Sequence, residues 1–487
     1  MNEPIRRLSV VVLLLFLTLM VSASWLQFAK AGQLGEDPRN VRTLYRQFGS
    51  FRGPIIVDGQ AVVSSVPVDD PFNYQRTYTD GQLYAPVTGY YSIGPGRSGL
   101  EGTENALLDG SADALFWTRL GNLFAGQEQE GASVELTIDA SVQRAAYDAM
   151  GDNRGAVVAL DPRTGAILAM VSTPTYDPTT LAVHSSSEAN RIYSSLVADQ
   201  TDPLINRAIG GDTYAPGSTF KLIVAAAALD SGYTPDTLVY APQELALPGT
   251  TATIKNYGGE RCGASDNIPL IDALRVSCNT AFADLAMRLG WGVIERTAAK
   301  FGWEQSLSIP LSVTPSRLPD KPNNPQIAQS GIGQFDVRAT PLQMAMVASA
   351  IANDGVLMKP YLVSTVRDPD LKVIQHTSPE VFSSSLSRDT AGALNAMMQA
   401  VVTDGTGRNA QIAGITVAGK TGTAETGTDT APHTWFIAFA PANDPVVAVA
   451  VLVENGGDLG NEATGGRVSA PIAKAVIQAA IDRAAGG

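Results

Sequence analysis

An uncharged stretch of 19 residues near the N-terminus, at positions 8–26, constrains the fold of this 487-residue chain more than any other feature. A helix of that length rises about 28 Å, enough to cross the hydrocarbon core of a bilayer. Arg6 and Arg7 precede the stretch, and Trp25 lies at its far end, where an interfacial aromatic side chain is favoured. No second stretch of comparable length lacks charges. We therefore predict a transmembrane anchor over residues 8–28 in the plasma membrane, crossed once, with the remaining chain outside the cytoplasm.

A cleaved signal peptide is the alternative to a retained anchor. Ser22, Ser24, Ala29 and Ala31 are small residues of the kind that a signal peptidase site needs. The apolar stretch is longer than the roughly 7–15 residues of a signal peptide core, which favours the anchor. Both alternatives imply export of the rest of the chain.

The composition is that of an acidic globular protein. Hydrophobic residues make up 45 % and charged residues 17 %, which excludes a disordered chain. The 34 basic and 47 acidic residues give a net charge of −13, so we expect no nucleic-acid partner. Three histidines and two cysteines are too few for a Cys/His structural zinc site, and we expect neither a metal nor a cofactor.

The two cysteines, Cys262 and Cys278, are 16 positions apart in the part of the chain that is expected to be exported. A disulfide closing such a loop stabilises a fold by about 3 kcal/mol in the chain-entropy model, and it persists in an oxidising compartment. We predict this disulfide, with two unrelated buried thiols as the alternative.

Strand and helix patterns divide the exported part into two regions. Residues 32–150 have the pattern of short strands and turns, with one helix near 141–150, and are expected to form an N-terminal domain. From Gly155 the sequence GAVVALDPRTGAILAMVS predicts a β-hairpin. Strands, then helices, then strands favour an α+β domain over 151–484, with an antiparallel sheet sandwiched by helices. The supporting patterns are helical at 218–229, 270–290, 341–353 and 390–402, strand-like at 435–440 and 446–453, and helical again in the terminal segment SAPIAKAVIQAAIDRAA.

Ser218 and Lys221 lie at the start of a run that favours a helix. The segment APGSTFKLIVAAAAL, residues 215–229, has a Pro-Gly turn followed by residues of high helix propensity, so both side chains are expected on one face. A serine hydroxyl becomes a good nucleophile when a neighbouring base takes its proton, and a lysine amine can do this only when uncharged. The pair predicts a nucleophilic serine, with an ordinary helix start and a surface lysine as the alternative.

Two further motifs carry groups that suit the same chemistry. Ser277-Cys278-Asn279 offers a hydroxyl that can shuttle a proton and an amide that can hold a peptide backbone, although alone it is also a capping sequence. The motif KTGT at 420–423 follows β-prone residues, so we expect it on a strand. Lys420 supplies a positive charge for a carboxylate and lowers the amine pKa of Lys221, while Gly422 lets a substrate backbone approach the strand edge.

In this order and spacing, the three motifs resemble those of the class B penicillin-binding proteins, a family of serine acyltransferases. The resemblance is closest to the short actinobacterial members and covers nearly the whole chain. Residues 155–178, 330–363 and 433–441 resemble segments of the family's transpeptidase domain, and 52–59 resembles the start of its N-terminal pedestal. It implies the penicillin-binding transpeptidase and serine β-lactamase-like fold, with a β-rich pedestal or dimerisation-like domain and one transmembrane helix. The cysteine inside Ser-x-Asn is a departure from the pattern, and a bond to Cys262 would tether that loop.

The resemblance also implies an activity, the cross-linking of peptidoglycan stem peptides by a D,D-transpeptidase. Ser218 would attack the penultimate D-Ala carbonyl, Lys221 would act as the base, and Ser277 would relay the proton to the leaving D-Ala. An amine acceptor resolves the acyl-enzyme, β-lactams stall it, and a membrane glycan polymerase of the shape, elongation, division and sporulation family is the expected partner. The implied catalytic residues are Ser218, Lys221, Ser277, Asn279 and Lys420; Thr421, Gly422 and Thr423 bind substrate, with the oxyanion held by the backbone N–H groups of Ser218 and Thr423.

Other functions remain open from the sequence. A membrane-anchored β-lactam sensor, a D,D-carboxypeptidase or a β-lactamase would share these motifs, although the Glu-x-x-Leu-Asn element of class A β-lactamases is absent between Ser277 and Lys420. The segment GITVAGKT at 414–421 matches a nucleotide-binding loop, but the residues after it are rich in Gly, Thr and Pro and cannot form the helix that such a loop requires. We assign no role to His184, His376 or His433.

Overall fold

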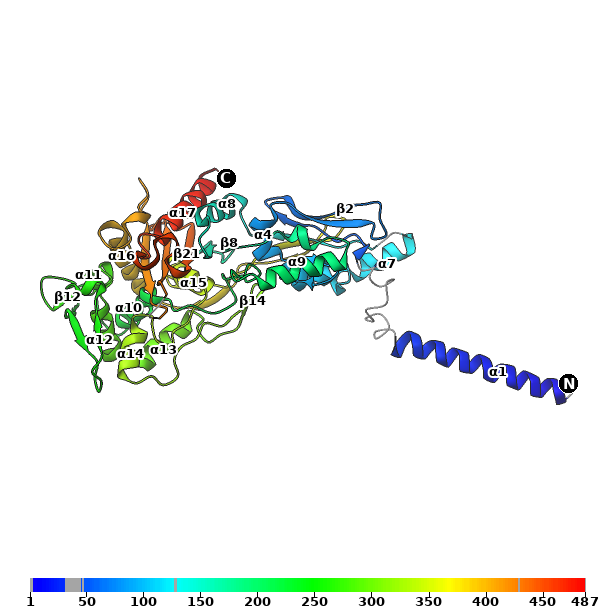
Figure 1. The fold of residues 1–487 in the computed structure, drawn as a ribbon, viewed down its shortest axis with the longest axis horizontal. Coiled ribbons are helices and arrows are strands. Elements are labelled where there is room, and N and C mark those ends of the chain that lie inside the picture. The colour runs from blue at the N-terminus through cyan, green and yellow to red at the C-terminus, as the bar shows by residue number, and fades with distance from the viewer. Residues whose placement is uncertain (1–2, 31–44, 46–47, 127–128, 428–429, 487) are drawn as a thin grey trace.

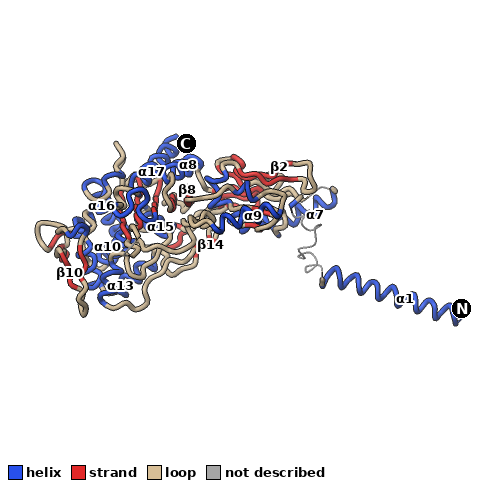
Figure 2. The backbone as a smooth tube through the Cα atoms, viewed as in Figure 1, coloured by secondary structure: helices blue, strands red, loops and turns tan. Residues whose placement is uncertain are grey.

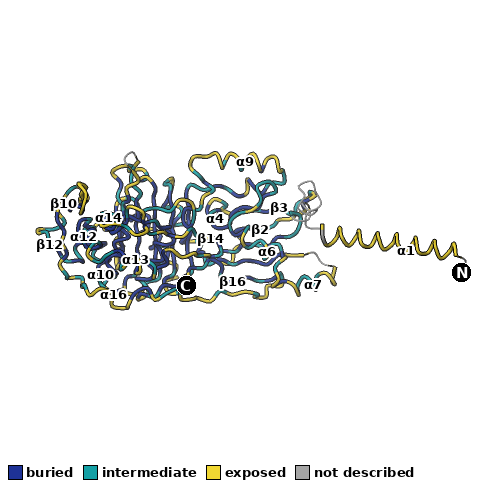
Figure 3. Tube along the Cα trace, turned by 90° about the horizontal axis from the view of Figure 1, so that it is seen from below, coloured by how far each residue is buried: buried dark blue, intermediate teal, exposed yellow. Residues whose placement is uncertain are grey.

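The computed structural model describes residues 3–30, 45, 48–126, 129–427 and 430–486 of an elongated molecule (Figure 1). At one end, helix α1 (Glu3–Ser24) and the π-helical turn η1 (Trp25–Ala29) project from the folded part. The stretch Glu3–Phe28 is long and apolar enough to cross a membrane, and Figure 3 shows α1 exposed along its length. Ala31 of the alternative cleavage site and the predicted domain boundary at residue 32 lie outside the described residues.

A five-stranded sheet, in the order β19-β20-β21-β7-β8, forms the centre of the C-terminal part. All of its neighbouring strands are antiparallel. The predicted hairpin is present as β7 (Gly155–Leu160) and β8 (Ile167–Thr173). The strand-like runs near the C-terminus are β20 (His433–Ala440) and β21 (Val447–Val453), and the KTGT motif lies on the edge strand β19 (Ala418–Ala424).

Helices cover both faces of this sheet (Figure 2). Along β20, Trp435 and Ile437 enter a core shared with α10 (Lys221–Asp230) and α15 (Pro341–Ala352). The alternate residues Phe436 and Ala438 enter a second core, because successive strand side chains point to opposite faces. That second core packs against α8 (Ala140–Met150) and α17 (Ser469–Gly486). The predicted sandwich of an antiparallel sheet between helices is confirmed.

The prediction of one continuous helix over residues 270–290 is wrong. The pattern over 270–290 is two helices, α11 (Leu270–Arg275) and α12 (Asn279–Leu289). Between them Ser277 has φ +60, a left-handed conformation that a helix cannot contain, so the chain turns sharply there. The helix expected from 218 likewise begins as a 3₁₀ turn, η4 (Gly217–Phe220), before α10.

The N-terminal part is less β-rich than its sequence suggested. Segment TYTDGQLYAP was expected to contain strands and turns, but it leads into helix α4 (Gly81–Thr88), in which Leu83 and Val87 are buried at helical spacing. Helix α7 (Phe116–Ala125) also lies in this part. Its six-stranded sheet has the order β17-β16-β6-β1-β2-β3, so two strands from beyond residue 150 complete it. These strands are β1 (Ile55–Val57), β2 (Gln60–Pro67), β3 (Tyr74–Tyr78), β6 (Ser133–Leu136), β16 (Val363–Arg367) and β17 (Val373–His376).

Shorter and peripheral elements complete the described chain. The helices are α5 (Gly99–Thr103), α6 (Asn105–Leu108), α9 (Ser186–Ala198), α13 (Trp291–Lys300), α14 (Asn324–Gly331) and α16 (Arg388–Asp404). The strands are β4 (Tyr91–Ser92), β5 (Gly96–Arg97), β9 (Leu238–Tyr240), β10 (Glu244–Ala246), β11 (Thr253–Lys255), β12 (Asn267–Pro269), β13 (Leu307–Ser308), β14 (Ser312–Val313), β15 (Val356–Met358) and β18 (Val381–Ser384).

Candidate active site

Four polar side chains from three distant segments meet beside the edge of the five-stranded sheet. The amine of Lys221 donates to the carbonyl oxygen of Ser277 over 2.7 Å and to Oδ1 of Asn279 over 2.8 Å, and lies 3.4 Å from the Ser277 hydroxyl. The amine of Lys420 donates to that hydroxyl over 2.8 Å and to the carbonyl oxygen of Thr421 over 2.9 Å. Ser277 is thus placed between the two amines.

Ser218 lies on η4, one turn before Lys221. In a 3₁₀ turn residues three apart lie on the same face, so the two side chains share a side of the element, as predicted. Ser218 is half-buried, and its hydroxyl makes no hydrogen bond to any described residue, Lys221 included. The hydroxyl is therefore accessible and not committed to a structural contact.

The turn that carries Ser218 is held by contacts with two other segments. Gly217 has φ +53, and a Cβ there would lie 2.7 Å from the carbonyl oxygen of Thr423 on β19. Its N–H donates to the carbonyl oxygen of Gly333 over 3.0 Å, and the indole N–H of Trp435 donates to the carbonyl oxygen of Ala215 over 3.0 Å. Glycine is required where backbone segments approach this closely. The contacts fix η4 against the edge strand.

Both lysines are fully buried, and burial lowers the pKa of each amine. Desolvation, and then repulsion from Lys420, hold the pKa of Lys221 well below its ordinary value. Desolvation lowers the pKa of Lys420 to about 7. A neutral amine keeps a lone pair and two N–H donors. The two N–H groups of a neutral Lys221 amine have acceptors in the Ser277 carbonyl oxygen and Asn279 Oδ1. Its lone pair is therefore available to take a proton.

Lys420 is therefore not the permanently charged group that the sequence suggested. With a pKa near 7 its amine is about half protonated at neutral pH, in the absence of a negative partner. A substrate carboxylate nearby would favour the ammonium form. The positive charge at this position depends on what occupies the site.

Gly422 of the KTGT motif was expected to make room for a substrate backbone, but in the structure its missing side chain makes room for other parts of the protein. A Cβ at Gly422 would lie 2.9 Å from Cβ of Trp435, and 3.0 Å from both the Pro216 carbonyl oxygen and Cγ2 of Thr219. The missing side chain lets η4 pack directly on β19. The hydroxyl of the preceding residue, Thr421, pairs with that of Thr406 at 2.6 Å.

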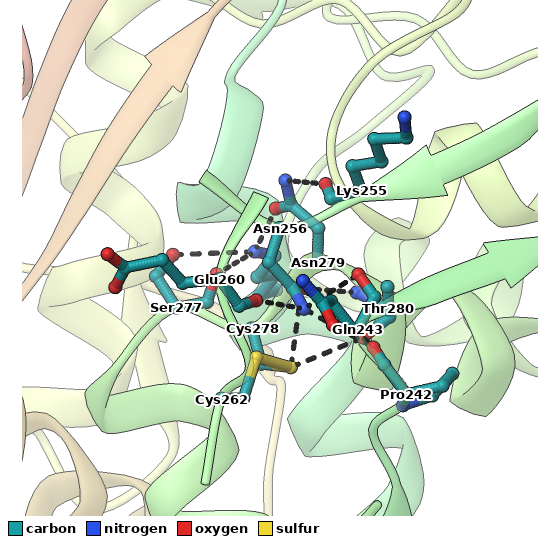
Figure 4. Close-up of a disulfide and its surroundings, with 11 residues drawn as sticks. Pro242, Gln243, Lys255, Asn256, Glu260, Cys262, Ser277, Cys278, Asn279 and Thr280 are labelled. Atoms are coloured by element: carbon teal, nitrogen blue, oxygen red, sulfur yellow. Dashed lines mark hydrogen bonds between the residues drawn. A yellow bond between two sulfur atoms is a disulfide. The ribbon is translucent and has the colours of Figure 1, made fainter. Parts of the chain in front are cut away.

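A second layer, which sequence reasoning missed, supports the Ser277–Asn279 turn (Figure 4). The carbonyl oxygen of Lys255, at the end of β11, accepts a hydrogen bond from Nδ2 of Asn279 over 3.0 Å, which orients the Asn279 Oδ1 toward Lys221. Oδ1 of the buried Asn256 accepts from the N–H of Thr280 over 3.1 Å. The Asn256 amide also donates to carbonyl oxygens of Pro242, Gln243 and Glu260. The turn-forming glycines after Asn256 are the one feature of the sequence that indicates this arrangement.

Cys262 and Cys278 are joined by a disulfide with a Cα–Cα distance of 5.8 Å. The bond ties the middle residue of the Ser277–Asn279 turn to the segment that follows Asn256 (Figure 4). It restrains the turn from which Ser277 and Asn279 contact Lys221.

A polar pocket of about 360 Å³ adjoins the Ser218 turn. Its lining includes Tyr214 and Ala215 before η4, Glu425 after β19, Arg338 and His433. Nδ1 of His433 accepts from the Asn455 N–H over 3.1 Å, and burial lowers its pKa, so the ring is held neutral beside the pocket. It contacts none of the four clustered side chains by hydrogen bond among the described residues.

The nucleotide-binding loop that the sequence suggested does not fit this geometry. Residues 414–421 end in the strand β19 and do not open a helix, so GITVAGKT is not a phosphate-binding loop. In the part of the chain that the structure describes, no group of three or more His, Cys, Asp or Glu side chains is arranged to hold a metal ion. The cluster instead suits acyl transfer: a free hydroxyl, a neutral amine, a second hydroxyl and an amide at one edge strand.

Two family models match the chain. The penicillin binding protein transpeptidase domain matches residues 155–478, and the penicillin binding protein A dimerisation domain matches residues 52–134. The first covers most of the chain and contains all three motifs.

Curated relatives and solved structures agree with these matches. The chain is 45 % identical to the peptidoglycan D,D-transpeptidase PbpA of Mycolicibacterium smegmatis, over 99 % of both chains. It is 43 % identical to the protein of the same name from Mycobacterium tuberculosis, again over 99 % of both. The ceftriaxone acyl-enzyme complex of M. tuberculosis penicillin-binding protein A superposes with a TM-score of 0.87, at 42 % identity, covering 90 % of this chain and all of that one. Its penicillin G acyl-enzyme complex superposes with a TM-score of 0.85 at 43 % identity, covering 89 % of this chain and all of that one.

Proposed function

The chain belongs to the penicillin-binding protein family, and from this we propose how its residues carry out the family's reaction. The protein is a peptidoglycan D,D-transpeptidase of the serine type, which β-lactams acylate. One observation supports our assignment of the site most strongly: Lys221, Ser277, Asn279 and Lys420 form one hydrogen-bonded cluster beside the Ser218 turn.

The first step assigns a nucleophile and a base. Ser218 Oγ attacks the penultimate D-Ala carbonyl, and its proton passes to the neutral amine of Lys221. The support is the lone pair that remains on Lys221 once Ser277 and Asn279 accept its two N–H groups. Since the two groups are not hydrogen-bonded in this structure, a small movement of the Ser218 rotamer brings the hydroxyl to Lys221 when substrate binds.

The second step returns the proton to the leaving group. The Ser277 hydroxyl lies between the amines of Lys221 and Lys420, which suits a relay that delivers a proton to the departing D-Ala amine. Asn279 then holds the peptide backbone of the donor stem through its amide. An incoming amine from a second stem peptide attacks the ester and regenerates the Ser218 hydroxyl.

The edge strand β19 binds the donor. The ammonium form of Lys420 and the hydroxyl of Thr421 receive the terminal carboxylate, and Gly422 keeps the strand close to η4. The backbone N–H groups of Ser218 and Thr423 hold the developing oxyanion. One such donor contributes about 3–4 kcal/mol to the transition state, so the tight contact between Gly217 and Thr423 matters for the rate.

We also propose the cellular arrangement of the protein. The N-terminal apolar helix, residues 8–28, is a retained single-pass anchor, and the catalytic domain, residues 151–484, is extracytoplasmic. Residues 32–150, with β16 and β17, form a pedestal that raises the active site above the membrane, as the elongated shape supports (Figure 1). A membrane glycan polymerase of the shape, elongation, division and sporulation family would supply the strands to be cross-linked.

The reaction is tested with a donor peptide ending in D-Ala-D-Ala and an excess of an acceptor D-amino acid, analysed by mass spectrometry. We expect the exchanged peptide as the main product, and a loss of at least about 10³-fold with Ser218→Ala. Ser231→Ala, at the far end of α10, is the matched control and keeps full activity. A hydrolysis product that has lost the terminal D-Ala without gaining the acceptor would identify a D,D-carboxypeptidase. Retained exchange by Ser218→Ala would overturn the assignment of the nucleophile.

A further inference from the structure

Helix α7 (Phe116–Ala125) exposes its apolar side and turns its polar side to the protein, the opposite of an ordinary surface helix. None of its residues is buried, and its apolar residues are exposed apart from Leu120, which is partly buried. Trp117 is 78 % and Phe124 84 % exposed. At 100° per residue, the apolar residues Phe116, Trp117, Leu120, Leu123 and Phe124 occupy one arc of about 120°.

The polar side of the same helix faces the protein. Thr118, Arg119 and Asn122 are partly buried, and the Arg119 guanidinium donates to the carbonyl oxygen of Ser111. A helix in water places its apolar arc inward and its polar arc outward. This opposite arrangement indicates that something outside the chain covers the apolar arc of α7.

We propose that the apolar arc of α7 docks into the outer surface of the lipid bilayer in which α1 is anchored. The position of α7 supports a membrane as the occupant: it lies at the end of the pedestal nearest α1, as two perpendicular views show (Figures 1 and 3). Lys30 and Phe48 are 18 residues apart, so this end of the pedestal lies within about 60 Å of the end of the anchor. Exposed Trp, Phe and Leu side chains on one arc are the residues that an interfacial helix presents to lipid.

The area and charge of the surface also favour lipid over a second copy of the chain. The five side chains offer about 500 Å² of apolar surface, whereas a stable dimer buries about 800 Å² on each partner. Arg119 is the one charged residue of α7, and it is turned toward the protein. The contact is therefore expected to depend on apolar insertion and not on anionic lipid. It would fix the tilt of the pedestal over the membrane, and with it the height of Ser218.

The inference rests on the proposed anchoring by α1, and the experiment tests the two separately. The described chain has no free cysteine, since Cys262 and Cys278 are paired, so one introduced thiol can carry a nitroxide label. Full-length protein is placed in nanodiscs containing one chain each, with either neutral or anionic lipid. Electron paramagnetic resonance then compares collisions of the label with oxygen, which enters lipid, and with a polar nickel chelate, which does not.

Three labelled positions give the comparison. Leu13→Cys, in the middle of α1, reports insertion of the anchor; Leu123→Cys reports docking of α7; and Leu238→Cys, on β9 far from the membrane, is the exposed control. We expect the ratio of oxygen to nickel collisions at 123 to exceed that at 238 by at least threefold in both lipids. Adding Trp117→Ser and Phe124→Ser should return the ratio at 123 to that at 238.

Each other outcome overturns the inference. A label at 13 in lipid with a label at 123 in water would refute docking by α7 and leave the anchor intact. A label at 13 in water would refute the anchor and docking together. If the label at 123 is shielded from the nickel chelate only when each nanodisc holds two chains, the occupant is a second copy of the chain. A raised ratio of oxygen to nickel collisions at 123 in anionic lipid alone would contradict apolar insertion.

Discussion

The amine of Lys420 and the hydroxyl of Ser277, on segments that are 143 positions apart, are joined by a hydrogen bond of 2.8 Å. Ser277 is also 3.4 Å from the amine of Lys221, so one hydroxyl connects both lysines of the site. The proposed relay would use this connection to carry a proton from the nucleophile to the leaving group without its entering bulk water.

Removal of the Ser277 hydroxyl should interrupt this relay. We expect Ser277→Gly to lower the rate of acylation by a fluorescent penicillin by about 10²–10⁴-fold, the usual contribution of a positioned acid or base. Glycine is the informative replacement because residue 277 has φ +60, which glycine adopts without strain. The thermal transition of the variant should therefore stay within a few degrees of the parent, and a near-normal acylation rate would exclude the relay.

Replacement of Lys420 should make the protein more stable and inactive. Its pKa is about 7 in the folded protein against 10.5 for a free lysine, so between these values the unfolded chain holds a proton that the folded protein does not. The contribution of Lys420 to the stability of the parent therefore rises with pH from about 7 to 10.5 and is constant below 7. We expect Lys420→Met to raise the free energy of unfolding by about 1–3 kcal/mol at pH 7, since lost hydrogen bonds offset part of the gain.

Urea unfolding across this pH range checks that prediction. The stability difference between Lys420→Met and the parent should be largest at or below pH 7 and should shrink toward pH 10.5. A difference that grows as the pH rises would mean that Lys420 remains charged in the folded protein.

The motif residues could be predicted from sequence because short-range rules govern them. The spacing of Ser218 and Lys221 on a helix start, and the β-prone residues before KTGT, were enough to place both groups on the correct elements. The nearly continuous apolar runs at 435–440 and 446–453 likewise predict strands, which the structure has as β20 and β21 with both faces covered. That these elements converge on one site came from resemblance and not from the pattern.

The features that the sequence left open depend on contacts between distant segments. The carbonyl oxygen of Lys255 orients Asn279, but a backbone carbonyl carries no residue signature. Strand β16 (Val363–Arg367) pairs with β6 more than 200 positions earlier, and hydrophobic alternation does not specify a partner. The break at Ser277 was missed because the apolar periodicity continues on both sides of it.

Asn256 is predicted to act on the active site through the turn that it supports. Asn256→Ala removes the acceptor of the buried Thr280 N–H, so we expect a loss of about 1–3 kcal/mol in unfolding free energy. Acylation should slow by at least about tenfold at a temperature where the variant is fully folded. Asn267→Ala, at an exposed position on β12, is the control and should change neither quantity. Normal acylation by folded Asn256→Ala would show that the turn keeps its geometry without this amide.

Gly422 should tolerate no side chain. Gly422→Ala places a Cβ within 3.0 Å of Trp435 on β20, Thr219 on η4 and the carbonyl oxygen of Pro216 just before η4, and these groups must move apart. We expect a loss of about 1–3 kcal/mol in stability and an acylation rate lower by about 10²-fold, because Ser218 moves relative to β19. Gly392→Ala on α16, where a Cβ meets no atom within 4 Å, should be neutral or slightly stabilising. Equal behaviour of the two variants would contradict the packing role of Gly422.

The most direct test of the proposed mechanism is the position of the covalent bond formed with a β-lactam. Full-length protein is treated with penicillin G, digested, and analysed by tandem mass spectrometry, beside Ser218→Ala and Ser231→Ala. We predict one adduct per chain, located on the peptide that contains Ser218, present in Ser231→Ala and absent from Ser218→Ala. An adduct on any other residue, or one that persists in Ser218→Ala, would contradict the central claim that Ser218 is the nucleophile.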